Sequence, residues 1–343
     1  MIETKITKMF GIKHPLISAP MGPFYTTDLT IALCEAGGMG VLSHTNLYGK
    51  SSVEEMKKNM LDVVEHTDKP FGFNIRTSRM QMDARTLCRK IPDFIRKNQK
   101  VREQALYALT SAGSAKMLPA SSSFQKLREQ SNIKHFHVAP ALWLADKCVD
   151  ANVDGLVLTG TEGGGHQSYE KVSTLVLLQQ VEEKYPDIPV VACGGFATGQ
   201  GVAAALSLGA DAVAMGTRFI ATKDCEFHDT YKNIIPPATA RDTVLTTGVF
   251  GPIRLWTNKY AKSQDLIGSK EEKKAMEAEL DINELAVINR KYELAYEGNI
   301  QDGAVLVGQT MGLIDQLKSV KGVVEGIVSD AEKYLKNAVS LIK

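Results

Sequence analysis

His166 is the titratable residue whose surroundings in the chain most clearly indicate chemistry. It follows a run of glycines, Gly160 and Gly163–Gly165, which ends the apolar stretch Leu156–Leu158. The apolar stretch predicts a buried strand of a parallel sheet, and glycines at its carboxyl end let a ligand approach the main chain closely. An imidazole beside such a ligand is a candidate acid–base group. A mobile glycine turn that carries a surface histidine would give the same local pattern.

Two further glycine breaks predict a phosphate site. Gly194 and Gly195 follow the apolar run Pro189–Cys193, and Ala214–Thr217 ends the next apolar run. In α/β barrels, phosphate is commonly held by the loops after the seventh and eighth strands. Backbone N–H groups would be the donors, the Thr217 hydroxyl could add one, and a helix starting near Gly199 would add its dipole. Alternatively, these glycines only tighten the turns.

The ligand that fits these loops best is flavin mononucleotide (FMN). A Rossmann fingerprint and a Walker lysine are absent from the sequence. We predict no metal site, and His135 and His137 are interpreted as a strand pair with one ring toward the barrel and the other toward the helices. The flavin ring would lie against the backbone at Pro20-Met21-Gly22, and Asn74 could bond a ring or ribityl oxygen. A structural bond from Asn74 to the backbone is the alternative.

Apolar runs that end in glycine, proline or polar residues recur along the chain and alternate with helical segments. This spacing predicts right-handed βαβ units in a parallel sheet. Eight units favour a closed (β/α)₈ TIM barrel over an open doubly wound sheet. Residues 76–100 are interpreted as a helical excursion, and residues 103–109 could form a helix instead of a strand. The expected strands are Leu16–Ala19, Gly40–Ser43, Phe71–Ile75, Ala105–Thr110, Lys134–Val138, Leu156–Leu158, Pro189–Cys193 and Ala212–Met215.

The α/β alternation stops near residue 225. We therefore predict three segments: an FMN-binding barrel over 1–225, an inserted, mainly helical subdomain on the substrate side over 226–299, and a C-terminal return over 300–343 that packs on the barrel. The last helix is expected from about Ser329 to Leu341. Phe250, Trp256 and Tyr260 could line the pocket from the inserted segment or form its core.

Composition excludes several classes of function. The chain has 343 residues, of which 44% are hydrophobic and 23% charged, and its net charge is +1. These values fit a globular enzyme acting on a small molecule and do not favour nucleic acid as a partner. No apolar run is long enough for a membrane helix, and no signal sequence is apparent. Five scattered cysteines favour reduced thiols in the cytoplasm. A homodimer is possible.

Four segments, in order, give the chain a family resemblance. They are Pro15-Leu-Ile-Ser-Ala-Pro-Met21, Gly72-Phe-Asn74, Gly160-Thr-Glu-Gly-Gly-Gly-His166 and the long run from Pro189 to Phe219. With the return at Asp302–Ile314, they resemble the nitronate monooxygenase (2-nitropropane dioxygenase) family of FMN-dependent barrels. The same landmarks occur in FMN-dependent enoyl-thioester reductases and in related quinone reductases.

The resemblance implies a catalytic base, a cofactor and its contacts. His166 matches the family's catalytic base, and FMN is the implied cofactor, with NAD(P)H as a possible electron donor. The chain departs from the family at Thr159, where glutamine is frequent, at Gly163, and at Pro23–Tyr25. The expected cofactor contacts are Ala19, Met21, Gly22, Asn74, Thr159, Gly164, Gly194, Gly195, Ala214, Met215, Gly216 and Thr217.

Three functions are compatible with these residues. The first is a nitronate monooxygenase that oxidises nitronates or nitroalkanes with O₂, with His166 as the base. The second is an NAD(P)H-dependent reductase of an enoyl thioester or a quinone, in which His166 orients or protonates the substrate. The third is a flavin- or phosphate-binding barrel with a regulatory role. The position of His166 directly after the glycine run argues against this function.

Overall fold

Eight parallel strands form a barrel in the computed structural model, which describes residues 2–248, 251–279 and 282–342. Their order is β1-β9-β8-β6-β5-β4-β3-β2. Between β1 and β2 the barrel is closed by a parallel bridge from Ile17 to Met39, where the Met39 N–H donates to the Leu16 carbonyl over 2.9 Å. The expected (β/α)₈ barrel is confirmed. The strands are β1 (Leu16–Ser18), β2 (Val41–Leu42), β3 (Phe71–Arg76), β4 (Ala105–Ser111), β5 (Lys134–Ala139), β6 (Gly155–Thr159), β8 (Val190–Cys193) and β9 (Ala212–Met215).

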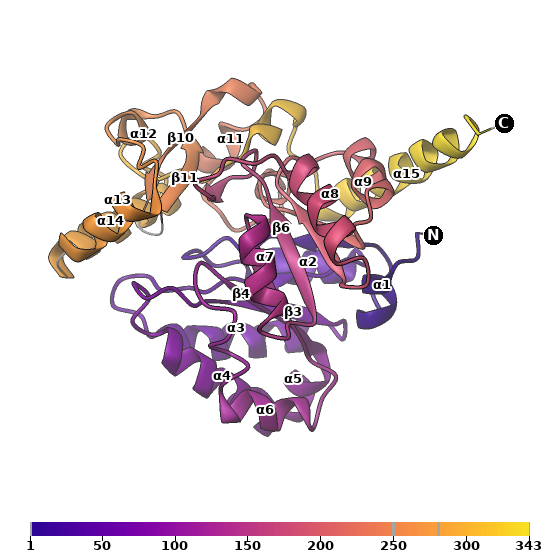
Figure 1. Cartoon of the computed structure of the whole chain (residues 1–343), viewed down its shortest axis with the longest axis horizontal. Helices are drawn as coiled ribbons and strands as arrows, with labels where there is room; N and C mark the ends of the chain where they lie inside the picture. The colour runs from indigo at the N-terminus through magenta and orange to yellow at the C-terminus, as the bar shows by residue number, and fades with distance from the viewer. Residues whose placement is uncertain (1, 249–250, 280–281, 343) are drawn as a thin grey trace.

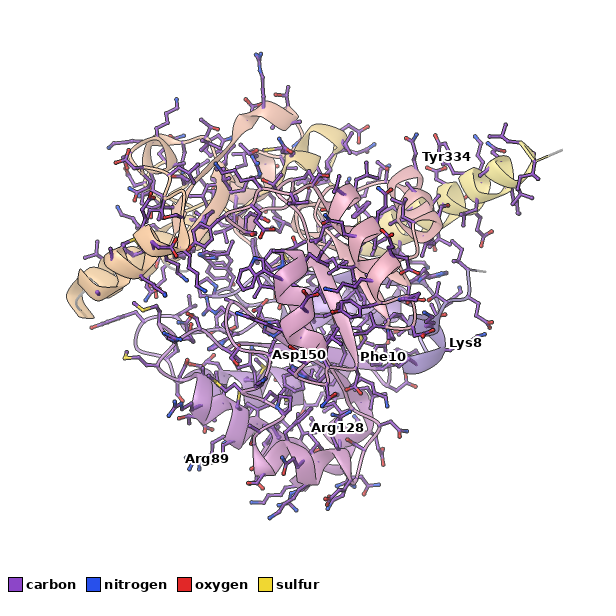
Figure 2. All side chains as sticks on the ribbon, viewed as in Figure 1. Lys8, Phe10, Arg89, Arg128, Asp150 and Tyr334 are labelled. Carbon is purple, nitrogen blue, oxygen red and sulfur yellow. The ribbon has the colours of Figure 1, made fainter. Side chains whose placement is uncertain are left out.

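Helices alternate with the strands and cover the outside of the barrel (Figure 1). The excursion at residues 76–100 is helical as expected, and the region that could have been a helix forms strand β4. The exposed side chain of Arg89, labelled in Figure 2, projects outward from this layer. The covering helices are α2 (Thr27–Glu35), α3 (Ser52–His66), α4 (Ala84–Lys97), α5 (Gln99–Gln104), α6 (Ser122–Arg128), α7 (Leu142–Val149), α8 (Thr174–Lys184) and α9 (Gly199–Ser207).

The barrel interior is filled by side chains, and the first helix closes one end of it. Phe10 of α1 (Lys5–Phe10) packs edge-on against Tyr107, and Tyr107 packs on Phe136, with ring centroids 5.4 and 5.0 Å apart. Two glycines make room for these rings. A Cβ on Gly72 would lie 2.5 Å from the Tyr107 ring, and one on Gly155 would lie 2.1 Å from the Phe136 ring. The filled interior leaves only the opposite, carboxyl end of the strands open for a ligand.

The C-terminal helix is longer than expected. Helix α15 spans Val320–Val339, so it begins well before the expected start near Ser329. Gly322 and Gly326 weaken the helical pattern in the sequence. The structure overrides that tendency, because Ser319 caps the first turn by accepting from the Gly322 N–H over 3.2 Å. The helix also buries an apolar stripe against the barrel. Its buried residues are Val320, Val323, Val324, Ile327 and Ala331.

The segment inserted after the last barrel strand is mainly helical, and it also contains a β-hairpin that the sequence analysis missed. β10 (Thr243–Gly248) pairs antiparallel with β11 (Gly251–Trp256), and β11 pairs with the two-residue strand β7 (Gly165–His166). The predicted catalytic histidine is therefore part of a sheet built largely by the insertion. The helices here are α10 (Thr217–Ile220), α11 (Asp229–Asn233), α12 (Lys259–Lys262), α13 (Lys270–Glu279) and α14 (Ile282–Tyr296), with 3₁₀ turns at Ala240–Asp242 and Gln309–Leu313.

No helix in the described part of the chain is long and apolar enough to span a membrane. The cytoplasmic location, the homodimer and the three-segment division remain predictions.

Candidate active site

A cavity of about 370 Å³ opens at the carboxyl ends of the barrel strands. Its volume lies in the range of small-molecule and cofactor sites. The structure brings every sequence-predicted site residue to the lining of this one cavity. These residues are Ala19, Met21, Gly22, Asn74, Thr159, Gly164, His166, Gly194, Gly195, Ala214, Met215, Gly216 and Thr217.

The glycine loop before His166 is held from both sides and is not a mobile turn. On the barrel side, the Thr174 N–H donates to the Glu162 carboxylate over 3.0 Å, and the Thr174 hydroxyl accepts from the Gly160 N–H over 2.9 Å. On the other side, Arg254 of β11 donates from Nε to the Thr161 carbonyl over 2.7 Å. Gly165 has a φ of 81°, a left-handed backbone conformation that favours glycine.

His166 lies where the insertion meets the barrel. It pairs with Ile253 of β11, and its side chain is partly exposed to the cavity. Burial lowers the pKa of His166 to about 3, and the positive charges of Arg76 and Lys273 act in the same direction. The imidazole is therefore neutral at physiological pH. A neutral ring can accept a proton or donate one N–H, but it cannot serve as a cationic acid.

The predicted phosphate loops converge as expected, with one difference. Gly194 and Gly195 have φ of 81° and 88°, and a Cβ on Gly216 would lie 3.7 Å from the Ala19 Cβ, in space that faces the cavity. The Thr217 hydroxyl accepts from the Gly308 N–H over 2.9 Å, which leaves its own proton available to donate. Helix α9 begins at Gly199 as expected, but the lining on this side ends at Phe196, so the contribution of its dipole stays a prediction.

The polar groups of the cavity fit an FMN molecule. Gln167 is 7% exposed and donates to the Gly163 carbonyl over 2.7 Å, while its Oε1 has no hydrogen-bond partner within the described chain. A buried acceptor of this kind needs a donor, and the ring N–H and ribityl hydroxyls of a flavin are donors. Asn74 makes a hydrogen bond to the backbone, which was the alternative to a bond with the flavin: its Nδ2 donates to the Leu109 carbonyl over 3.3 Å. It lines the cavity as well.

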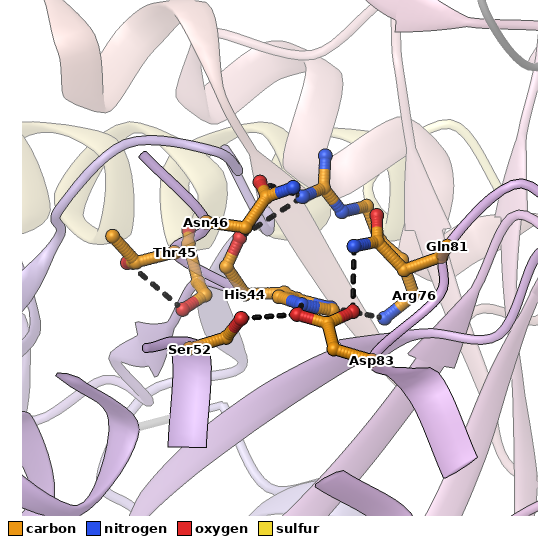
Figure 3. A network of polar contacts seen from close by, with 8 residues as sticks. His44, Thr45, Asn46, Ser52, Arg76, Gln81 and Asp83 are labelled. Carbon is orange, nitrogen blue, oxygen red and sulfur yellow. Dashed lines mark hydrogen bonds and ion pairs between the residues drawn. The ribbon is translucent and has the colours of Figure 1, made fainter. Parts of the chain in front are cut away.

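Arg76 is a site residue that the sequence analysis did not identify. It ends strand β3 two residues after Asn74, so both side chains share the face toward the cavity. Its guanidinium donates to the Asn46 side chain and, over 3.4 Å, to the His44 carbonyl (Figure 3). The two-residue spacing after Asn74 was the available signal.

A polar network around Asp83 fixes the backbone that carries Arg76 (Figure 3). The His44 ring accepts the Arg76 N–H at Nδ1 over 3.0 Å, and its Nε2 lies 3.2 Å from the Asp83 carboxylate. Burial opposes ionisation of Asp83, but donors from His44, Ser52 and Gln81 hold its pKa below the usual range. Burial lowers the pKa of His44 to about 4. The neutral imidazole therefore has its proton on Nε2 and links Asp83 to strand β3.

The expectation that His135 and His137 face opposite sides of strand β5 is wrong. Both rings contact the Thr110 hydroxyl, His135 through Nε2 over 2.7 Å and His137 through Nδ1 over 2.6 Å. Residues two apart on a strand share a face. His135 also packs edge-on against Phe124 of α6, which places the pair on the helix side. No group of three or more metal-ligating side chains occurs among the described residues.

The cysteines show no sign of redox activation. All five are free thiols. Cys193 lines the cavity, and burial raises its pKa to about 11. A thiol needs the thiolate form to react, so Cys193 is best explained as a packing residue.

An aromatic cluster joins the first barrel loop to the insertion. Phe24 stacks on Tyr296 at 5.1 Å and meets Phe227 edge-on at 5.0 Å. The departure from the family at Pro23–Tyr25 therefore coincides with a contact between the two segments. Of the aromatic residues proposed for the pocket, Trp256 and Tyr260 pack on the main core instead, and Phe250 lies outside the described residues.

Comparisons with known proteins agree with this geometry. A family model described as nitronate monooxygenase matches residues 3–330. An indene-carboxyl-CoA dehydrogenase of Mycobacterium tuberculosis is 29% identical, over 100% of this chain and 99% of that protein. A nitronate monooxygenase of Paraburkholderia phytofirmans is 28% identical, over 71% of this chain and 73% of that protein. The structure of FabK from Thermotoga maritima superposes with a TM-score of 0.80 at 31% identity and covers 100% of both chains.

Proposed function

The chain belongs to the nitronate monooxygenase family of oxidoreductases, and from this we propose that it is an FMN-dependent enzyme that reduces or oxidises the acyl group of a thioester, with NAD(P)H or NAD(P)⁺ as the partner. The observation that carries the enzymatic role is that neutral His166 and cationic Arg76 line one cavity. The full-length similarity to a CoA-thioester dehydrogenase and to FabK supports a thioester as the substrate.

FMN would be held by the loops that the sequence predicted. Backbone N–H groups of Gly194, Gly195 and Gly216, with the Thr217 hydroxyl, would bind the phosphate. Gln167 and Asn74 would meet the polar edge of the ring system or the ribityl chain. When bound, FMN would supply the electron-transfer chemistry, which no side chain can supply.

His166 and Arg76 would act on the substrate oxygen and on the proton next to it. A thioester carbonyl gains negative charge when the neighbouring carbon becomes nucleophilic. A fixed cation and an N–H donor in an enclosed site stabilise that charge before any solvent has to reorganise. The neutral imidazole is also in the protonation state that accepts a proton. A bound anion would raise the pKa of His166 from its low value toward neutrality.

Nitronate oxidation is the second candidate. A nitronate is an anion with the charge on oxygen next to the reacting carbon, so it would use the same pair of groups. The family description and the relatives named nitronate monooxygenase favour this substrate.

Anaerobic mixing distinguishes the two. We expect NADH or NADPH to bleach the flavin absorbance rapidly and an enoyl thioester to restore it, whereas a propyl-2-nitronate should react slowly. Rapid bleaching by the nitronate and none by either nicotinamide would contradict the thioester proposal and support nitronate oxidation. In both cases His166→Gln should retain FMN and lower kcat by at least about 100-fold, the usual range for removal of an acid–base group.

A further inference from the structure

The outer part of the cavity contains a group of residues that none of the roles above uses. Trp143 of helix α7 and two lysines of helix α13, Lys270 and Lys273, line it. We call these three residues the mouth cluster. They come from two separate parts of the chain, because α7 covers the barrel and α13 belongs to the insertion (Figure 1).

Two lysines near the start of α13 line the cavity. They are Lys270 and Lys273, whereas Lys274, on the same helix, is not among the lining residues. The Lys270 ammonium lies 5.5 Å from the Trp143 ring centroid, and Lys147 approaches the same ring at 4.7 Å. The acidic neighbour Glu272 is engaged elsewhere, since its carboxylate accepts from the Gly268 N–H over 2.9 Å.

The charged side chains that line the described part of the cavity are all cationic. Arg76, Lys270 and Lys273 line it, and none of its described lining residues is acidic. A small anionic substrate would need only the cation nearest the reacting centre. Lysines at the opening would then have no use in binding it. Their position fits a ligand that carries a second, separate negative charge outside the cavity.

The aromatic ring indicates what accompanies that charge. The Trp143 indole is partly exposed at the opening and attracts cations, since the ammonium groups of Lys147 and Lys270 lie over its ring. A heteroaromatic base stacks on such a face, and lysines recognise phosphate as point charges. Purine and phosphates occur together in nucleotides, and in coenzyme A they are attached to a thioester through a long flexible chain.

We propose that the mouth cluster binds the adenosine 3′,5′-bisphosphate end of a coenzyme A thioester, with the base on Trp143 and the phosphates on Lys270 and Lys273. The assignment rests on the proposed function, because it identifies the carrier of the acyl group that enters the cavity. In this assignment α13, whose two lysines line the opening, selects substrates by their carrier.

Steady-state kinetics with two carriers tests the assignment. The holoenzyme is assayed with crotonyl-CoA and with crotonyl-N-acetylcysteamine, which has the same acyl group and no nucleotide. We expect K270A, K273A and W143A each to lower the ratio of kcat/KM for the CoA substrate to that for the truncated substrate by about tenfold. The effect should appear in KM. Lys274→Ala, on the same helix but outside the cavity lining, is the matched control and should leave the ratio within about twofold.

A binding measurement separates this inference from the proposed function. Adenosine 3′,5′-bisphosphate is titrated into the holoenzyme in a calorimeter, and K270A should weaken its binding by about tenfold, whereas K274A should not. Binding that depends on Lys270 supports the subsite even if neither thioester is turned over. A lack of turnover would refute only the proposed thioester chemistry. Turnover of both thioesters with equal kcat/KM, or a raised KM for NADPH instead of the CoA substrate in K270A, would overturn the subsite alone.

Discussion

Acid should destabilise this protein steeply, because the folded chain holds the pKa of four histidines well below the ordinary value. Burial lowers the pKa of His135 and His166 to about 3, and that of His44 and His137 to about 4. The ordinary histidine pKa is about 6.5. Each ring therefore remains unprotonated in the folded chain and takes up a proton only on unfolding. The folded state keeps its full stability above about pH 6.5 and loses stability as the pH falls toward 4.

Glu226 acts in the opposite direction. Burial raises the pKa of its carboxyl group to about 7, where it accepts the N–H groups of Asp28 and Leu29 at the start of α2. This group binds its proton more tightly in the folded chain, so it contributes stability as the pH falls from 7 to about 4.5. At pH 5 these four histidines take up nearly four protons on unfolding and Glu226 releases most of one. His14, whose pKa burial lowers, adds to the uptake, and Asp211 and Glu182, whose pKa burial raises, offset it, so the net uptake is about three.

An uptake of about three protons corresponds to a loss of about 4 kcal/mol of unfolding free energy per pH unit near pH 5. The uptake can be measured directly, by denaturing the protein with urea in weakly buffered solution and back-titrating to the starting pH. His135→Gln, which removes one of the buried rings, should reduce the uptake by about one proton. An uptake below about one proton for the wild type, or an unchanged uptake in H135Q, would refute the reasoning.

Three further predictions concern the support of the cavity. Gly194→Ala should weaken FMN retention and lower stability by about 1–3 kcal/mol, because the new Cβ would lie 3.0 Å from the Gly163 Cα at a φ of 81°. Dialysis measures the retention of FMN, and thermal melting measures the stability. Gly326→Ala, whose Cβ meets no atom within 4 Å, is the control that should not destabilise the protein. Tyr231→Phe should cost about 1–3 kcal/mol, since the hydroxyl both accepts from the Leu306 N–H and donates to the Leu306 carbonyl; an unchanged urea midpoint would argue against it. Arg254→Lys should lower kcat more than stability, because it removes the donors to the Thr161 carbonyl and the Thr243 hydroxyl that hold the loop before His166; a kcat equal to that of the wild type would show that the loop does not need this fork.

The barrel and the inner part of the site could be predicted because both follow from local pattern. Apolar runs that break into glycine mark the carboxyl ends of parallel strands, and a barrel brings these ends together. Gly194, Gly216 and His166 could therefore be placed in one cavity from their sequence positions alone. Arg76 follows from the same logic, since it continues the alternation of β3 beyond Asn74.

The outer part of the site could not be predicted, because its residues meet only through tertiary packing. Lys273 is one charge in a run of Lys, Glu and Ala, and nothing local shows that α13 covers the opening. The hairpin of β10 and β11 had a signal in the β-branched residues of 243–256, but Pro252 and the glycines near it interrupt the strand pattern. The pairing of β11 with Gly165–His166 joins segments far apart in sequence.

The small sheet of β7, β10 and β11 has a consequence for how this protein can change over evolutionary time. The insertion that covers the opening also supplies the strand beside His166, since Ile253 pairs with the histidine and Arg254 with Gly165. Substitutions or length changes that adapt the insertion to a new substrate will therefore also shift His166, the proposed acid–base group. Exchange of the insertion between relatives should succeed only when the glycine–histidine loop is exchanged with it, so the two segments form one unit of inheritance despite their separation in the chain.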